Sequence, residues 1–202
     1  MLAVAGGKGG CGKTTTALGL GLTAASKAVV VDTDRDMPNL HAMAGVEREP
    51  TATAVGQGAA PQSVDEGLSV VPAPPASTDD AAIPLVLDAV ARATEGGVIV
   101  DCPGGAGPDA AAPLSAATEV LLVSTACAPA LRDAAKTAAM ARALGCRVAG
   151  VVLTRTRVAP RGVESLLDCP VLGTVPTVSG PILDDDCVRS AYREIDRQLR
   201  FE

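Results

Sequence analysis

Short apolar runs rich in valine, isoleucine and leucine alternate along the chain with longer alanine-rich segments. Runs such as "EVLLVS" and "VAGVVLT" are almost continuously apolar, which is typical of strands buried on both faces of a parallel sheet. The pattern predicts strands over residues 2–5, 28–32, 68–72, 98–101, 120–124, 148–154 and 171–175.

The segments between these runs have the length and composition of helices. We expect helices over residues 13–26, 79–94, 109–116, 129–144, 161–167 and 182–199. This alternation indicates an α/β fold with a doubly wound, mainly parallel sheet flanked by helices, whose ligands bind at the carboxyl ends of the strands. Residues 45–67 and 71–78 are interpreted as surface loops, so residues 1–202 are expected to form a single domain.

Composition narrows the class of protein. The chain holds one tyrosine, one phenylalanine and no tryptophan, so its core must be aliphatic. A net charge of −6 argues against a protein that coats DNA or membranes. The six cysteines include no CxxC pair, and the single histidine, His41, has no neighbours with metal-ligand spacing. We therefore expect reduced thiols and no zinc or iron–sulfur site.

The first apolar stretch is too short for a signal peptide, and no run of about 18 apolar residues occurs. These features predict a cytoplasmic protein.

The stretch "GGKGGCGKTTT", residues 6–16, follows the first predicted strand and opens the first predicted helix. It contains the P-loop pattern, in which glycines let backbone amides converge on phosphate oxygens. Lys13 would reach the β and γ phosphates, and Thr14 would supply a hydroxyl to Mg²⁺. The alternative is a chance glycine-rich turn, but strand, loop, lysine, threonine and helix coincide. A second lysine, Lys8, precedes Lys13 in the same loop.

Phosphoryl transfer also needs an acid to hold the metal and a group to position the attacking water. Asp32 and Asp34 follow one buried strand in "VVVDTDRD", and Asp101 follows another in "VIVDCPGG". The alternative is that such acids only cap the next segments, an interpretation that suits Asp36 or Asp109 better. The guanine-reading Asn-Lys-x-Asp segment is absent because the one asparagine, Asn39, precedes a leucine. ATP is therefore favoured over GTP.

"GKGGCGKTT" resembles the deviant Walker A motif of the MinD/ParA family of dimerising ATPases, whose signature is an extra lysine at the position of Lys8. "VVVDTDRDMPNLHAMAGVE" looks like the MinD branch, in which Asn-Leu follows the two aspartates. "VDCPGG" and "VLGTVP" are similar to the family's switch segment and to its late strand near adenine. The resemblance spans nearly the whole chain and implies a P-loop NTPase fold.

The resemblance implies roles for individual residues. Mg²⁺ would be bound directly by Thr14, with Asp32 and Asp101 acting through its water shell. Asp34 would orient the hydrolytic water, and Lys8 would reach the phosphates of the ATP held by a partner subunit. The nucleotide contacts implied are Gly9, Gly10, Cys11, Gly12, Lys13, Thr14, Thr15, Arg155 and Pro176.

The resemblance implies an ATP-dependent homodimer with slow Mg²⁺-dependent hydrolysis, which positions or recruits a cellular structure through an unknown protein partner or activator. The chain departs from the family in having no basic amphipathic helix after its core, so direct membrane binding is not expected. The site near the adenine also reads Thr154-Arg155 where many relatives have Asn-Arg, and Thr177 follows Pro176 where an acid is frequent.

Two other functions stay open. A DNA-segregation ATPase of the ParA type is possible because Arg189, Arg193, Arg197 and Arg200 recur at helical spacing. Intermixed acids such as Glu194 favour a solvated, ion-paired helix face instead. A metabolic P-loop enzyme is the third class, but such enzymes usually lack a lysine at position 8, and no cluster for an acceptor substrate is visible.

Overall fold

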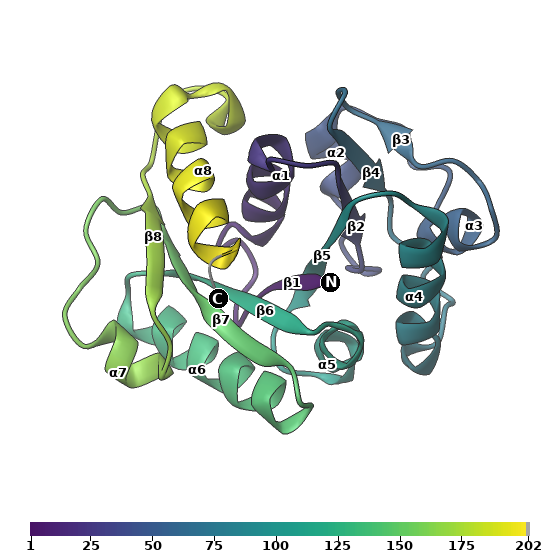
Figure 1. The fold of residues 1–202 in the computed structure, drawn as a ribbon. Coiled ribbons are helices and arrows are strands. Elements are labelled where there is room, and N and C mark those ends of the chain that lie inside the picture. The colour runs from purple at the N-terminus through teal and green to yellow at the C-terminus, as the bar shows by residue number, and fades with distance from the viewer. Residues whose placement is uncertain (201–202) are drawn as a thin grey trace.

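A single eight-stranded sheet forms the centre of the computed structural model, which describes residues 1–200, for Arg200 the backbone only (Figure 1). The strand order is β3-β4-β2-β5-β1-β6-β7-β8, and all neighbours are parallel except β3 and β4. The strands are β1 (Leu2–Gly6), β2 (Ala28–Asp32), β3 (Gln62–Ser63), β4 (Leu68–Val71), β5 (Gly97–Gly104), β6 (Glu119–Thr125), β7 (Arg147–Thr154) and β8 (Val171–Val175).

Helices cover both faces of the sheet, as expected for a doubly wound fold. They are α1 (Lys13–Thr23), α2 (Leu40–Ala44), α3 (Ala52–Gly56), α4 (Ile83–Ala93), α5 (Pro108–Ala116), α6 (Ala128–Ala143), α7 (Val163–Leu167) and α8 (Asp186–Arg200), with 3₁₀ turns η1 (Asp80–Ala82) and η2 (Ile182–Asp184). Buried side chains of α1, α2 and α8 form the core on one face, and those of α3 to α7 form the core on the other. The predicted fold class is confirmed.

The structure corrects several predicted boundaries. Residues 45–67, predicted to be loop, contain α3 and the antiparallel edge strand β3. The α3 helix has only five residues and is held by its packing on α4 and by the Ala52 amide, which donates to the Pro72 carbonyl at 2.8 Å. The predicted helix 182–199 breaks at Asp185, whose carboxylate accepts from the Cys187 and Val188 amides and caps α8.

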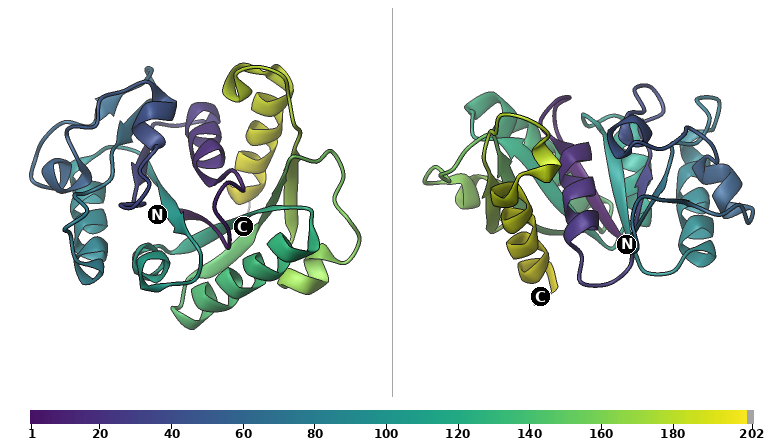
Figure 2. Two further views of the ribbon diagram at one scale, coloured as in Figure 1. Left: turned by 180° about the vertical axis from the view of Figure 1, so that it is seen from behind. Right: turned by 90° about the horizontal axis from the view of Figure 1, so that it is seen from above.

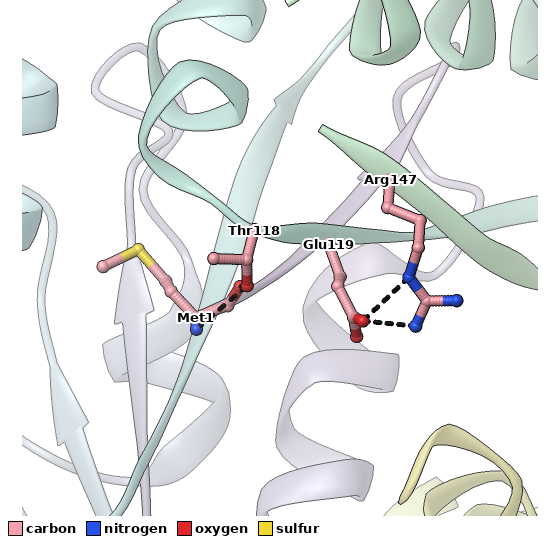
Figure 3. A network of polar contacts seen from close by, with 4 residues as sticks. All are labelled: Met1, Thr118, Glu119 and Arg147. Atoms are coloured by element: carbon pink, nitrogen blue, oxygen red, sulfur yellow. Dashed lines mark hydrogen bonds and ion pairs between the residues drawn. The ribbon is translucent and has the colours of Figure 1, made fainter. Parts of the chain in front are cut away.

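Polar contacts hold the central strands at the amino ends, opposite the predicted site (Figure 3). The Thr118 hydroxyl, at the start of β6, donates to the Met1 carbonyl at 2.9 Å. Glu119 and Arg147 lie opposite each other on β6 and β7, and the Arg147 Nε donates to the Glu119 carboxylate at 2.9 Å. These contacts link the amino ends of β1, β6 and β7.

Helices α1 and α8 lie side by side on one face of the sheet (Figure 2). At their contact, Gly19 of α1 packs against Tyr192 of α8. Tyr192 of α8 is almost fully buried, and its hydroxyl lies 3.3 Å from that of Thr16 on α1. Burial raises the pKa of Tyr192 to about 12, so this phenol stays neutral. A methyl group added to Gly19 would lie 2.3 Å from the Tyr192 ring, so glycine is the residue that allows this approach.

We therefore predict that Gly19→Ala destabilises the protein. Overpacking against a buried ring costs more than the helix propensity that alanine adds, which leaves a net loss of about 1–2 kcal/mol in the free energy of unfolding. Urea unfolding measures this loss. Gly97→Ala is the matched control, because a methyl group there meets nothing within 4 Å. A Gly19→Ala protein at least as stable as wild type would contradict the packing described here.

Candidate functional site

The loop between β1 and α1 has a backbone that only glycine adopts easily at two positions. Gly10 and Gly12 have φ angles of 74° and 98°, in the left-handed region. A methyl group on Gly7 would lie 2.3 Å from the Asp133 backbone, so α6 supports the loop from behind. Gly9 and Gly10 are exposed, and a methyl group added at either would meet nothing within 4 Å, so this part of the loop is open beside the amino end of α1. Such an arrangement binds phosphate.

A cavity of about 260 Å³ opens beside this loop. It is lined by most of the predicted nucleotide contacts and by Asp34, so these residues come together in the structure. It also includes residues that sequence reasoning did not assign to the site. The full lining is Gly9, Gly10, Gly12, Lys13, Thr14, Thr15, Asp34, Met37, Asn39, Met43, Cys102, Gly104 and Arg155.

The two lysines of the loop lie in different surroundings. Lys13 lines the cavity and is 8% exposed. A methyl group on Gly104 would lie 3.3 Å from the Lys13 Nζ and 3.1 Å from the Gly9 nitrogen, so the carboxyl end of β5 lies close against the loop. Lys8 is exposed, is not among the residues that line the cavity, and its side chain forms no hydrogen bond or ion pair within residues 1–200.

Two buried carboxylates lie beside the loop because Asp32 on β2 pairs directly with Asp101 on β5. Asp32 accepts from the Asp34 and Leu40 amides at 2.8 and 3.2 Å. Burial raises its pKa to about 6. Burial and the neighbouring charge of Asp32 raise the pKa of Asp101 to about 8. Both carboxyl groups are therefore harder to ionise than an exposed aspartate, and Asp101 is harder to ionise than Asp32.

The oxygen donors fit a Mg²⁺ ion. The Asp101 Oδ1 is buried and has no hydrogen-bond partner in the described structure. The Thr14 hydroxyl donates to the Asn39 Oδ1 at 3.0 Å, and both residues line the cavity. Hard cations such as Mg²⁺ prefer oxygen ligands and keep several waters. No group of three or more His, Cys, Asp and Glu side chains within residues 1–200 is placed to hold a metal unaided.

Asp34 stands at the edge of the cavity, in the loop that joins β2 to α2. Its carboxylate accepts from the Met37 amide at 3.0 Å, and its own amide is bonded to Asp32. Its backbone is therefore tied to the buried acid pair, while its carboxylate borders the cavity. A carboxylate in this position can accept a hydrogen bond from a water beside bound phosphates.

A second cavity of about 140 Å³ shares Gly12, Thr15 and Arg155 with the first. Pro176, predicted from the resemblance, lines it, and so does Tyr192, which sequence reasoning did not assign to the site. The rest of its lining is Cys11, Thr154, Val175, Thr177, Val178 and Ile182. Its size and mostly apolar lining suit a nucleotide base beside the phosphate loop.

Thr154 and Arg155 bond to the loop itself. The Thr154 hydroxyl donates to the Cys11 carbonyl at 2.7 Å, and the Arg155 Nη2 donates to the Gly10 carbonyl at 2.7 Å. Arg155 has a φ of 58°, an unusual conformation for a residue other than glycine. The Cys11 side chain is buried, and burial raises the pKa of its thiol.

A parallel sheet with a glycine-rich loop, a buried lysine and two strand-end acids defines the class of P-loop nucleotide-binding proteins. A family model described as the CobQ/CobB/MinD/ParA nucleotide binding domain matches residues 2–191. The chain belongs to this family, which confirms the resemblance drawn from its motifs.

Individual relatives agree with this assignment. An uncharacterised ATP-binding protein of Methanocaldococcus jannaschii is 31% identical over 193 residues, which are 87% of this chain and 73% of the relative. The chloroplastic septum site-determining MinD homologue of Arabidopsis thaliana is 26% identical over 223 residues, 96% of this chain and 67% of the relative. The solved structure of a MinD from Pyrococcus horikoshii complexed with Mg-ADP has a TM-score of 0.81 at 21% identity, with 96% and 93% of the two chains covered.

The raised pKa of Asp101 predicts a pH dependence of stability in Mg²⁺-free buffer. The folded protein keeps the proton up to about pH 8, whereas the unfolded chain loses it near the ordinary value of 3.8. The native state therefore binds more protons between these limits, and the free energy of unfolding falls as the pH rises through them.

Asp101→Asn removes this proton binding. Urea unfolding at pH 5 and pH 8 should show a smaller loss of stability in Asp101→Asn than in wild type. Equal losses in the two proteins would show that Asp101 titrates normally.

Proposed function

We propose that this protein is an ATP-dependent dimerisation switch with slow, Mg²⁺-dependent ATP hydrolysis, which positions or recruits a cellular structure or a partner protein. The observation that carries the proposal is the contrast between the two lysines. Lys13 is buried in the phosphate site of its own subunit, whereas Lys8 extends to solvent without an ion pair in the described structure. An exposed lysine ammonium beside a phosphate site is able to contact negative charge on a second subunit.

ATP would occupy the two adjoining cavities, with its phosphates on the loop and its base near Pro176. Mg²⁺ would neutralise phosphate charge as it develops during transfer. Thr14 would exchange its hydrogen bond to Asn39 for the metal, and Asp32 and Asp101 would accept from the metal's waters. The unpartnered Asp101 Oδ1 supports this assignment.

Asp34 would orient the hydrolytic water, because it lies at the edge of the cavity beside the acid pair. One orienting carboxylate without a stronger base is consistent with slow turnover. Slow turnover suits a switch, because the ATP-bound dimer then persists long enough for a partner protein to bind it.

Dimerisation would bring Lys8 of each subunit to the phosphates of the other. Charge-assisted hydrogen bonds to phosphate are about twice as strong as neutral ones. Without the γ-phosphate this gain falls, so ATP would favour the dimer and ADP would release it. The activator and the cargo are protein partners that would recognise the dimer.

The contacts of α8 do not favour the DNA-binding alternative. The Arg197 guanidinium forms an ion pair with Glu194 at 2.7 Å, as expected for a solvated helix face rather than a DNA-binding stripe. The Arg200 side chain, the last arginine of the predicted stripe, lies outside the described residues. The apolar side of α8 is turned inward, with Val188, Tyr192 and Ile195 buried. Within residues 1–200, no helix is both long and apolar enough to span a bilayer.

If the protein is an ATP-dependent switch, a variant that cannot hydrolyse ATP should stay dimeric. Asp34→Ala should bind ATP and Mg²⁺ without hydrolysing the nucleotide, so size-exclusion chromatography with light scattering should show a stable dimer with ATP and a monomer with ADP. Adding Lys8→Ala to this variant should restore the monomer even at saturating ATP, because the cross-subunit contact is lost.

Lys27→Ala is the matched control, since Lys27 is also an exposed lysine but pairs with Glu95 at 3.0 Å at the amino end of β2. The Asp34→Ala, Lys27→Ala protein should remain dimeric with ATP. A monomeric Asp34→Ala protein that still binds ATP would rule out the switch and leave a monomeric enzyme as the better account.

A further inference from the structure

Arg35 lies in the loop of residues 33–39, which joins β2 to α2 and contributes Asp34 and Asn39 to the cavity. Its side chain is only 14% exposed. The guanidinium donates to the Thr78 carbonyl and to the Asp80 carboxylate, with which it forms an ion pair. None of Arg35, Thr78 and Asp80 lines the nucleotide cavity. Arg35 therefore anchors the loop to a part of the molecule outside the site.

The other side-chain contacts of this loop with the rest of the protein lead toward the site. The Thr33 hydroxyl donates to the Asp101 carbonyl, the Asp34 amide donates to Asp32, and Asn39 accepts from Thr14. Thr14 is assigned above to direct contact with Mg²⁺, so its hydrogen bond to Asn39 would be lost when the metal binds. The Arg35 contacts are independent of that exchange.

The segment that receives Arg35 is itself fixed. The Thr78 amide donates to the Pro75 carbonyl at 2.9 Å, and the Asp79 carboxylate accepts from the Ala81 amide at 3.0 Å. The 3₁₀ turn η1 then runs directly into α4, whose Ile83 and Leu87 are buried in the core. A planar guanidinium that contacts two acceptors on such a segment holds a defined orientation.

We propose that Arg35 is a positioning residue, which holds the loop of residues 33–39 against Thr78 and Asp80 so that Asp34 stays in place when Mg²⁺ displaces Asn39 from Thr14. This proposal rests on the ATPase activity proposed above. Arg35 lines neither cavity, so we expect its loss to lower turnover more than nucleotide affinity.

The test is a comparison of ATP hydrolysis and nucleotide affinity in Arg35→Met. A misplaced catalytic group costs orders of magnitude in rate, so kcat should fall by about tenfold or more, while KM and the affinity for a fluorescent ADP analogue stay within about twofold. Arg35→Lys should recover part of kcat, since it keeps the charge beside Asp80 but not the planar two-acceptor contact. Arg48→Met is the matched control, because Arg48 is exposed and no contact of its side chain is recorded within residues 1–200.

Asp80→Asn, alone and combined with Arg35→Met, completes a double-mutant cycle. If the two residues act as one unit, the double variant is no slower than Arg35→Met alone. Hydrogen exchange in the nucleotide-free proteins supplies a readout without hydrolysis, and Arg35→Met should speed exchange of the amides of residues 33–39 but not of α1.

An Arg35→Met protein with wild-type kcat, or one that loses nucleotide affinity in parallel with kcat, would overturn the proposal. Additive effects in the cycle would overturn it as well. If wild-type protein binds ATP but shows no turnover, the proposed ATPase function fails instead. Hydrogen exchange then tests the role of Arg35 on its own. Unchanged exchange of the amides of residues 33–39 in Arg35→Met would overturn the proposed positioning role.

Discussion

The pairing of Asp32 with Asp101 across β2 and β5 is the constraint on which the site depends. It buries two carboxylates side by side, where desolvation raises the pKa of both and the charge of Asp32 raises the pKa of Asp101 further. The parallel sheet forces this arrangement, since carboxyl ends of neighbouring strands meet at one edge. One oxygen of this pair, the Asp101 Oδ1, has no hydrogen-bond partner in the described structure, and Thr14 and Lys13 line the cavity beside it, where they would be within reach of a metal ion and a nucleotide phosphate.

The glycines around this pair set how close the other elements come. Gly104 lets the carboxyl end of β5 lie against Gly9 and Lys13, and Gly7 lets α6 support the loop from behind. Within this loop Lys13 is buried and Lys8 is exposed, so the two lysines lie in different surroundings.

The strands and the site loop could be predicted from the sequence because each has a local signal, namely continuous apolar runs and a fixed spacing of glycine, lysine and threonine. The edge strand β3 could not, since its two polar residues are ordered by pairing with β4. Asn39 and Tyr192 enter the site through tertiary contacts that no spacing encodes. The same holds for Arg35 and Asp80, whose ion pair joins positions 45 residues apart. The helix predicted over residues 182–199 was too long. Apolar periodicity does not reveal that Asp185, inside this segment, caps α8 and so marks the start of the helix.

The central claim is that Lys8 acts on the nucleotide of the other subunit, and complementation between two inactive variants tests it most directly. In a mixed dimer of Lys8→Ala and Asp34→Ala subunits, the Lys8→Ala subunit keeps its own Asp34 and receives Lys8 from its partner. One of the two sites is then complete. The account predicts that each variant alone shows no ATP hydrolysis and that an equimolar mixture recovers a substantial fraction of wild-type turnover. A mixture no more active than the two variants measured separately would contradict it.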